Sequence, residues 1–211
     1  PLNAIYQNNE AGGDLTWRKA GRSYDIDFFD YSSGLNGAEY RAISDGVEVI
    51  SWSNISGVVG KEFTTDWNVD FNSLKDGATN YISIRVFDVA GNTTTIPNAF
   101  FIKKDTTLPV ITNYEEGGEN IWRKTPRSYN VDFSDYESGL SGAVWKAYYN
   151  NNLVSSGEIS GVSGKEFTDD WNVDFDSLID EATNYITIEV YDVATNTNTL
   201  ENAFKILKLI L

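Results

Sequence analysis

The sequence predicts an all-β chain made of two tandem β-sandwich domains, and three observations lead to this prediction. The chain repeats itself at a spacing of about 105 residues. Within each copy, hydrophobic residues alternate with polar ones, as they do in strands that are buried on one face only. Turn residues separate these runs at short intervals, and no stretch has the period of an amphipathic helix.

The internal repeat is strong. Trp17-Arg18-Lys19 returns as Trp122-Arg123-Lys124, and the run from Asp66 to Phe71 returns unchanged as Asp170 to Phe175. About 60% of the aligned positions are identical. A unit of about 100 residues is a common size for a domain that folds by itself. We therefore predict two domains, residues 1–105 and 106–211.

The alternation indicates which residues form the core. Tyr24, Ile26 and Phe28 share one face of a strand, while Asp25 and Asp27 lie on the other. The same pattern predicts three further inward rows, namely Ile82, Ile84 and Val86; Trp67, Val69 and Phe71; and Tyr129, Val131 and Phe133. Six to eight short strands per copy predict a sandwich of immunoglobulin type.

One position in this pattern predicts a tyrosine corner. Tyr81 and Tyr185 each begin the penultimate strand of a copy, directly after a polar turn. That is the place of a tyrosine corner, in which the hydroxyl bonds to backbone a few residues upstream. We therefore expect both hydroxyls to bond to upstream backbone.

Composition excludes several classes of function. The 211 residues include 16 Lys and Arg against 31 Asp and Glu, with no Cys, His or Met. Without His and Cys there is no Ser-His-Asp or Cys-His nucleophile system and no imidazole or thiolate zinc site. A formal net charge of −15 repels phosphate, and no run approaches the roughly 20 apolar residues of a membrane span, so we predict neither nucleic-acid binding nor membrane insertion.

Carboxylates are the remaining side chains that could act as catalytic acids and bases. Asp25 with Asp27 and Asp169 with Asp170 are spaced like candidate acid and base pairs. Adjacent residues on a strand point to opposite faces of the sheet. Residues two apart share a face, which for such carboxylates is usually the one exposed to solvent. No pocket is implied, so we predict that the chain is not an enzyme.

Short motifs resemble a known family. Asp88-Val89-Ala90-Gly91-Asn92 and the run from Lys103 to Pro109 resemble the ends of bacterial immunoglobulin-like repeats, which are related to fibronectin-III and cadherin domains and build large cell-surface proteins. The second copy departs from the pattern, with Thr195 in place of Gly91. The resemblance implies an extracellular or cell-surface chain, and a first residue that is not Met fits a processed or excised segment.

The acidic loops form the sharpest candidate site. In an immunoglobulin topology, the loops that carry Asp135, Glu137, Asp192 and Asn196 meet at one pole, where the linker residue Asp105 also enters. Oxygens from these segments could bind Ca²⁺ at the interdomain joint and stiffen it. Asp and Asn also favour turns for their own sake, which is the alternative interpretation. The first copy carries the matching residues Asp30, Asp88 and Asn92.

Two tryptophans are candidates for binding a sugar by stacking of their flat rings against it. Trp67 and Trp171 are in phase with inward rows, which favours burial. Trp17 and Trp122 lie outside any clear alternation and precede cations, so they are the better surface candidates. Their alternative role is that of ordinary exposed aromatic residues.

The C-terminal run is apolar and has two possible roles. It can complete the second sandwich as a last strand, or it can pair with an edge of an identical subunit and form a filament. The residues that would mediate such assembly are Ile206, Leu207, Leu209, Ile210 and Leu211.

The sequence as a whole predicts a non-catalytic stalk or spacer module of an extracellular protein, whose partners are neighbouring repeats. One alternative is a self-assembling filament or surface-layer subunit that binds identical copies. A second alternative is a carbohydrate-binding or adhesive module that binds a glycan.

Overall fold

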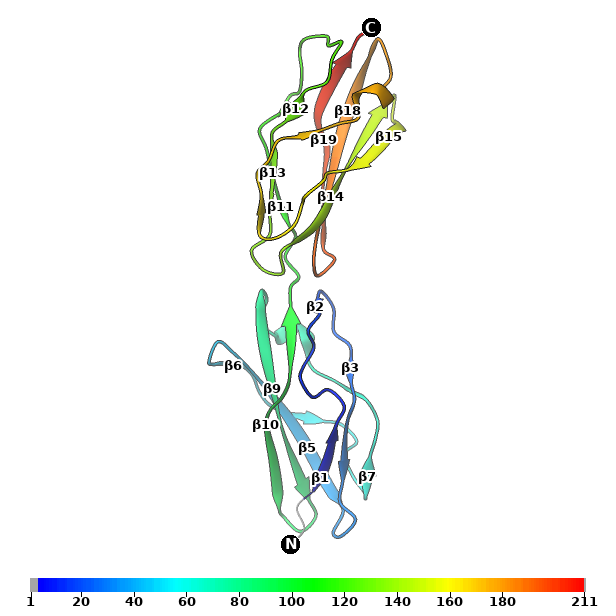
Figure 1. The fold of residues 1–211 in the computed structure, drawn as a ribbon. Coiled ribbons are helices and arrows are strands. Elements are labelled where there is room, and N and C mark those ends of the chain that lie inside the picture. The colour runs from blue at the N-terminus through cyan, green and yellow to red at the C-terminus, as the bar shows by residue number, and fades with distance from the viewer. Residues whose placement is uncertain (1–3, 211) are drawn as a thin grey trace. The chain divides into compact units, whose positions relative to one another are not determined.

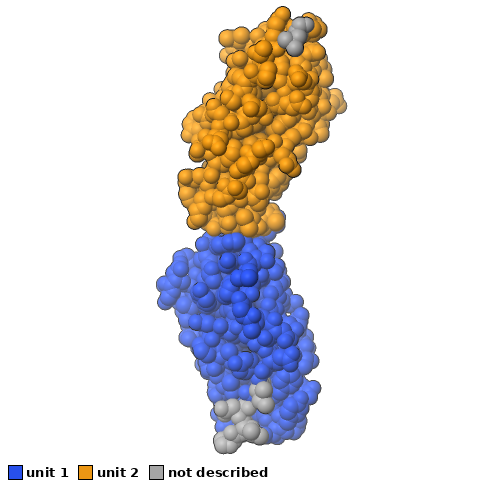
Figure 2. Space-filling view, in the orientation of Figure 1, with its two compact units in different colours: residues 1–106 blue, residues 107–211 orange. Residues whose placement is uncertain are grey.

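The computed structural model describes residues 4–210, and the chain forms two compact units, Pro1–Thr106 and Thr107–Leu211. Figure 2 colours unit 1 blue and unit 2 orange. Within the described range, the regular elements are strands and two single 3-10 turns. No helix of this range is long and apolar enough to cross a bilayer. The fold is all-β, with two tandem sandwich domains, as predicted.

Unit 1 is a sandwich of two sheets (Figure 1). Its elements are β1 Ile5–Asn8, β2 Trp17–Arg18, β3 Ser23–Tyr24, β4 Ile26–Phe29, β5 Leu35–Ser44, β6 Val47–Ile55, β7 Glu62–Phe63, β8 Trp67–Asn68, η1 Phe71–Ser73, β9 Ala78–Asp88 and β10 Thr93–Lys104. One sheet has the order β1-β4-β7 and the other the order β2-β10-β9-β5-β6, while β3 pairs with β8. All neighbours are antiparallel except β2, which runs parallel to β10. Strand neighbours that lie far apart in sequence give the Greek-key order of an immunoglobulin sandwich.

Unit 2 repeats this arrangement. Its elements are β11 Val110–Asn113, β12 Ser128–Tyr129, β13 Val131–Ser134, β14 Leu140–Tyr149, β15 Asn152–Glu158, β16 Glu166–Phe167, β17 Trp171–Asn172, η2 Phe175–Ser177, β18 Ala182–Asp192 and β19 Thr197–Lys208. The sheets have the orders β11-β13-β16 and β15-β14-β18-β19, and β12 pairs with β17. A parallel bridge between Arg123 and Lys208 replaces the pairing of β2 with β10.

The predicted inward rows form the cores. Tyr24, Ile26 and Phe28 are at most 1% exposed, and they pack in one cluster with Ile82 and Ile84 of the facing sheet. The matching residues of unit 2 are buried in the same way. Burying one such side chain stabilises the fold by about 1.5–3 kcal/mol. Trp67 and Trp171 are also in the cores, at 6% and 5% exposure, which confirms their predicted burial.

In each unit the chain enters at one end and leaves at the other (Figure 1). At the entry pole of unit 2, Val110 begins β11 opposite Ser134 at the end of β13. At its exit pole, Lys208 ends β19 opposite Ala182 at the start of β18. Unit 1 has its entry pole at the end of β4 and its exit pole at the end of β10.

The exit pole is closed by an asparagine, and the predicted tyrosine corner is wrong. Tyr185 lies on the outward face of β18 and is 43% exposed, whereas Asn184 is fully buried. The Asn184 amide donates to the carbonyl of Ile179 at 3.0 Å, and its Oδ1 accepts from the Ile179 N–H at 3.0 Å. In unit 1, Tyr81 is likewise 43% exposed, and Asn80 makes the equivalent pair of bonds to Lys75.

A lysine completes the same pole. Lys208 is 7% exposed, and its ammonium donates to the carbonyls of Asp176 at 3.1 Å and Leu178 at 2.9 Å. Asp180 lies 3.0 Å from the same ammonium. In unit 1, Lys104 holds the corresponding two carbonyls. The lysine therefore satisfies the carbonyls of the 3-10 segment, which the end of the sandwich would otherwise leave unpaired.

Unit 2 keeps the turn geometry of unit 1 at two turns where another residue replaces glycine. Gly77 and Gly91 have φ values of 62° and 87°, and the residues in their places, Glu181 and Thr195, have values of 50° and 70°. A branched residue such as Thr rarely adopts this left-handed conformation. The pairing of the long strands therefore sets these turns more strongly than the local residue preference does.

Replacing Asn184 with Ala will destabilise unit 2 by about 2–3 kcal/mol, because a buried N–H and a buried carbonyl lose their partner. Urea unfolding of the full chain measures this loss. Tyr185→Phe is the control and will change stability by less than about 0.5 kcal/mol. A larger loss of stability in Tyr185→Phe than in Asn184→Ala would instead support the tyrosine corner.

Candidate functional sites

At the entry pole of unit 2, two predicted metal ligands lie together. Carboxylate oxygens of Asp135 and Asp192 are within 4.8 Å of each other. Asp135 accepts hydrogen bonds from the N–H groups of Gly139 at 2.7 Å and Glu137 at 3.1 Å. Glu137 thus belongs to the loop that surrounds Asp135.

The turn between β18 and β19 holds the other half of this cluster. One oxygen of Asp192 accepts from the backbone N–H of Asn196, and the second accepts from the Asn196 side-chain amide, both at 2.7 Å. These bonds show the turn-capping role that was the alternative interpretation of the acidic loops. Paired carboxylates of this kind could also bind a hard cation, because two negative groups this close repel each other until a positive charge lies between them.

Unit 1 has the same arrangement. Asp30 accepts from the N–H of Ser32 at 2.8 Å and from the hydroxyl of Ser33 at 3.0 Å, and Asp88 accepts from Asn92. Hydrogen bonds from Asn92 lower the pKa of Asp88 and outweigh the opposing effect of burial. Asp30 and Asp88 are only 4% and 1% exposed.

The remaining predicted ligand belongs to unit 1. Asp105 follows β10 at the exit pole, where its N–H donates to the carbonyl of Arg18 at 3.0 Å. One of its carboxylate oxygens lies within 4.8 Å of one of Asp76, a residue that the sequence analysis had not singled out as a ligand. The five predicted ligands are therefore divided between two units, and an ion at the joint stays a prediction.

The two candidate sugar tryptophans differ in exposure. Trp122 is 44% exposed. Trp17 is half-buried as part of β2, and the Lys103 ammonium lies 5.7 Å from the centroid of its ring. Of the two, Trp122 offers more of its ring to solvent.

The C-terminal run completes the second sandwich, which is the simpler of its two possible roles. Ile206 is fully buried in the core, and Leu207 accepts the N–H of Arg123 at 2.8 Å through its carbonyl. Leu209 donates its N–H to the carbonyl of Arg123 at 2.8 Å. Ile210 is 52% exposed, and Leu211 lies outside the described residues.

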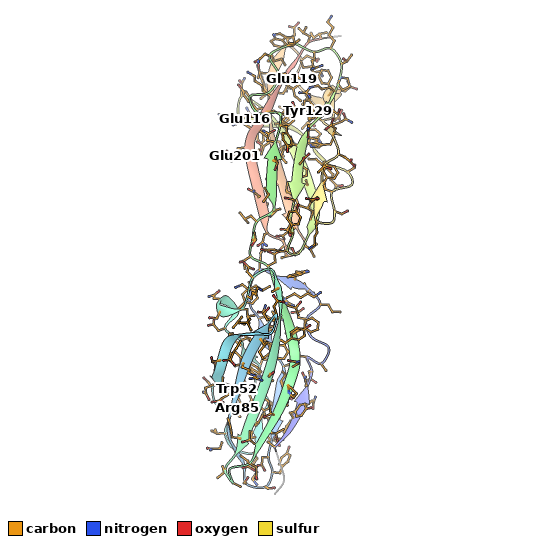
Figure 3. All side chains as sticks on the ribbon, turned by 90° about the vertical axis from the view of Figure 1, so that its left-hand side faces the viewer. Trp52, Arg85, Glu116, Glu119, Tyr129 and Glu201 are labelled. Carbon is orange, nitrogen blue, oxygen red and sulfur yellow. The ribbon has the colours of Figure 1, made fainter. Side chains whose placement is uncertain are left out.

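A buried charge network that the sequence analysis missed lies in the loop between β11 and β12, and Figure 3 labels one of its residues, Glu119, together with the nearby Tyr129. The carboxylate of Glu119 has a side-chain exposure of only 4% and is bound by Arg123 at 2.5 Å and Arg127 at 2.6 Å. Arg127 also binds both oxygens of Glu115, at 2.9 Å and 2.5 Å. These bonds lower the pKa of Glu115 and raise that of Arg127.

Tyr129 lies under this network. Its ring is 4.2 Å from the Arg127 guanidinium carbon, and burial raises the pKa of its hydroxyl. Unit 1 repeats the network with Glu10 and Asp14 as acids and Arg18 and Arg22 as bases, over the ring of Tyr24. The signal available in the sequence was the repeated spacing of four residues between acid and arginine, at 14 and 18 and at 119 and 123.

No protein-family model matches this chain. No curated protein is significantly similar to it in sequence. Solved structures resemble it in fold. One contains the fibronectin(III)-like modules of Clostridium thermocellum CbhA, with 11% identity, a TM-score of 0.35, and 98% of this chain and 94% of that one covered.

Two further similar structures come from adhesion proteins. A tetra-tandem repeat in the extending region of a large adhesion protein has 13% identity and a TM-score of 0.33, and 96% of this chain and 47% of that one are covered. A 1.5-MDa bacterial ice-binding adhesin has 14% identity and a TM-score of 0.37, with 97% and 65% covered. The chain thus spans about half and about two thirds of the length of these two. The likeness to bacterial immunoglobulin-like and fibronectin-III-like modules is the one that the motifs predicted.

Replacing Arg127 with Met will destabilise unit 2 by about 2 kcal/mol at pH 7, since it removes charged hydrogen bonds from Glu115 and Glu119. The folded-state pKa of Glu115 lies below its ordinary value of 4.5. The stability that depends on this carboxylate is therefore complete above pH 4.5 and is lost as the pH falls through the lower folded value.

Urea unfolding at pH 7 and pH 3 checks this expectation. The difference between the parent chain and the Arg127→Met variant will be smaller at pH 3. Arg22→Met in unit 1 is the matched variant and will behave in the same way. An equal loss of stability at both pH values would contradict an ionic role for the network.

Proposed function

We propose that this chain is a non-catalytic structural module, a stalk or spacer, of an extracellular or cell-surface protein. The observation that carries the proposal is that each unit is a separate sandwich whose chain enters at one pole and leaves at the other. Such units can be joined in series without rearrangement, because each has its own core and its own closed ends.

The chemistry of the two units supports the same role. Each exit pole is closed by Asn and Lys side chains, and each entry pole by Asp side chains that accept backbone N–H groups. Ends that are closed by the unit's own residues do not need a neighbour in order to fold. The long strands β9, β10, β18 and β19 run between the poles, and each antiparallel pair is hydrogen-bonded on both sides of a single bulge.

Single-molecule stretching of the full chain tests the spacer role. We expect two separate unfolding events, each lengthening the chain by about 300 Å, since about 100 residues extend at 3.3–3.6 Å each from a compact domain. A single event that releases both units together would contradict units that fold independently.

Light scattering distinguishes the spacer from the filament alternative, in which the C-terminal run binds an identical subunit. Truncation after Lys205 would remove the core residue Ile206, so the sharper variant is Ile210→Asp, which changes an exposed side chain. We expect the parent chain and this variant to be monomeric. If the parent chain forms polymers and the Ile210→Asp variant does not, the C-terminal run mediates assembly, as the filament alternative requires.

We also propose that the carboxylates of Asp135 and Asp192, two of the five ligands predicted from the sequence, bind a hard cation such as Ca²⁺. Ca²⁺ at ten times its dissociation constant will stabilise the folded unit by about 1.4 kcal/mol and raise its thermal midpoint by about 5 °C or more. Thermal unfolding in Ca²⁺ and in chelator measures this shift.

The variant Asp192→Asn will lose the response to Ca²⁺. Asp169→Asn, which changes a carboxylate elsewhere in unit 2, is the control and will keep it. Equal thermal midpoints of the parent chain in Ca²⁺ and in chelator would contradict cation binding. The acidic residues would then serve only to cap the turns.

A further inference from the structure

The outward face of the larger sheet of unit 2 contains a hollow of about 260 Å³. Its most buried residue is Thr187 of β18, which is 6% exposed and forms the floor. The residues around it come from β14, the turn after β14, β18 and β19, and they are Tyr148, Asn151, Glu189, Thr199, Glu201 and Asn202.

A backbone irregularity forms this hollow. Ile186 pairs with Phe204 and Ile188 with Leu200, so β18 advances two residues while β19 advances four. The extra residues form a bulge at Asn202, whose φ is 50° and whose N–H donates to the Thr187 hydroxyl at 3.3 Å. A bulge bends its strand and redirects the side chains. The bulge therefore brings Glu201 and Asn202 to the rim above Thr187.

The polar groups around the hollow divide into two sets. Glu189 is fully engaged, because Lys146 binds one oxygen at 2.5 Å and the Tyr191 hydroxyl donates to the other at 2.8 Å. Among the described residues, the carboxylate of Glu201 and the hydroxyl of Thr199 have no hydrogen-bond partner. The rim thus offers acceptors and donors that are free to bind a ligand beside an aromatic ring.

Unit 1 has the same backbone with different chemistry. Its bulge lies at Asn98, with φ of 47° and an N–H that donates to the Ser83 hydroxyl at 3.1 Å. The residues in the places of Tyr148 and Glu201 are Ile43 and Pro97, whose side chains form no hydrogen bonds.

The position of Glu189 is also altered. Arg85 replaces Glu189, pairs with Glu39, and lies 4.4 Å from the ring centroid of Trp52 (Figure 3). In two copies that share about 60% of their residues, Thr95 and Asn98 of unit 1 stand in the places of Thr199 and Asn202, whereas the ring of Tyr148 and the carboxylate of Glu201 belong to unit 2.

We propose that the hollow of unit 2 binds one ring of a neutral carbohydrate. The volume is below that of sites for drug-sized ligands, which limits the occupant to a single ring or the end of a chain. One face of a sugar ring is apolar and suits the Tyr148 ring, while its hydroxyls can donate to Glu201 and exchange hydrogen bonds with Thr199 and Asn202. Unit 2 carries 7 basic and 17 acidic residues, a net charge of −10 that opposes an anionic sugar.

The test is a nitrogen-15 NMR titration of the full chain with glucose, galactose, mannose and N-acetylglucosamine at millimolar concentrations. We expect at least one sugar to shift the amide signals of Thr187, Thr199 and Asn202. Tyr148→Ala and Glu201→Gln will each weaken this binding by about tenfold, while Tyr148→Phe will retain most of it because the ring remains.

Pro97→Ala, at the equivalent place in unit 1, is the matched control and will leave the titration unchanged. The variants change surface residues, and the dispersion of the remaining amide signals shows that they are folded. Absence of shifts with all four sugars, or shifts confined to the surroundings of Trp122, would overturn the proposal. Binding of N-acetylneuraminic acid alone would overturn the assignment of a neutral ligand. Any of these failures leaves the spacer role untouched, because that role depends on the poles and cores.

Discussion

The structure depends on closing the two open ends of each sandwich. Between the sheets, apolar side chains fill the space, but at the poles the turns expose backbone N–H and carbonyl groups to a dry interior, where an unpaired group costs about 1–3 kcal/mol. Each unit meets this constraint with buried polar side chains. Asn184 and Lys208 close the exit pole of unit 2, and Asp135 and Asp192 accept N–H groups at its entry pole. The same residue types close unit 1 at the matching positions.

The residues that hold each unit together are separate from those on its outward faces, and this separation connects the fold with the proposed role. Because poles and core hold each unit together, the outward sheet faces can change without loss of the frame. Unit 1 carries a stack of Arg85 on Trp52 there, and unit 2 carries a paired Lys146 and Glu189 beside a polar hollow. A spacer built of such units can therefore acquire a binding face on one repeat while its neighbour keeps only the frame.

The alternation of residues predicted the fold closely, because burial on one face of a strand leaves a direct record in the sequence. The inward rows through Tyr24, Ile26 and Phe28 and through Ile82 and Ile84 are in the core. The same alternation, followed strictly, would have corrected the tyrosine corner. Asn184, and not Tyr185, is in phase with Ile186 and Ile188, so the buried polar residue lies one position earlier.

By itself, the sequence determined the class of fold, the internal repeat and which residues face the core, since these follow from patterns within single strands. Only the tertiary structure decided which polar residues meet. Glu119 lies between Arg123 and Arg127 because a loop folds back on itself, and the hollow joins Tyr148, Thr187 and Glu201 from three different strands. Contacts of this kind depend on strand register and on a bulge in β19, whose position is set by pairing across the sheet and leaves no periodic signal in the chain.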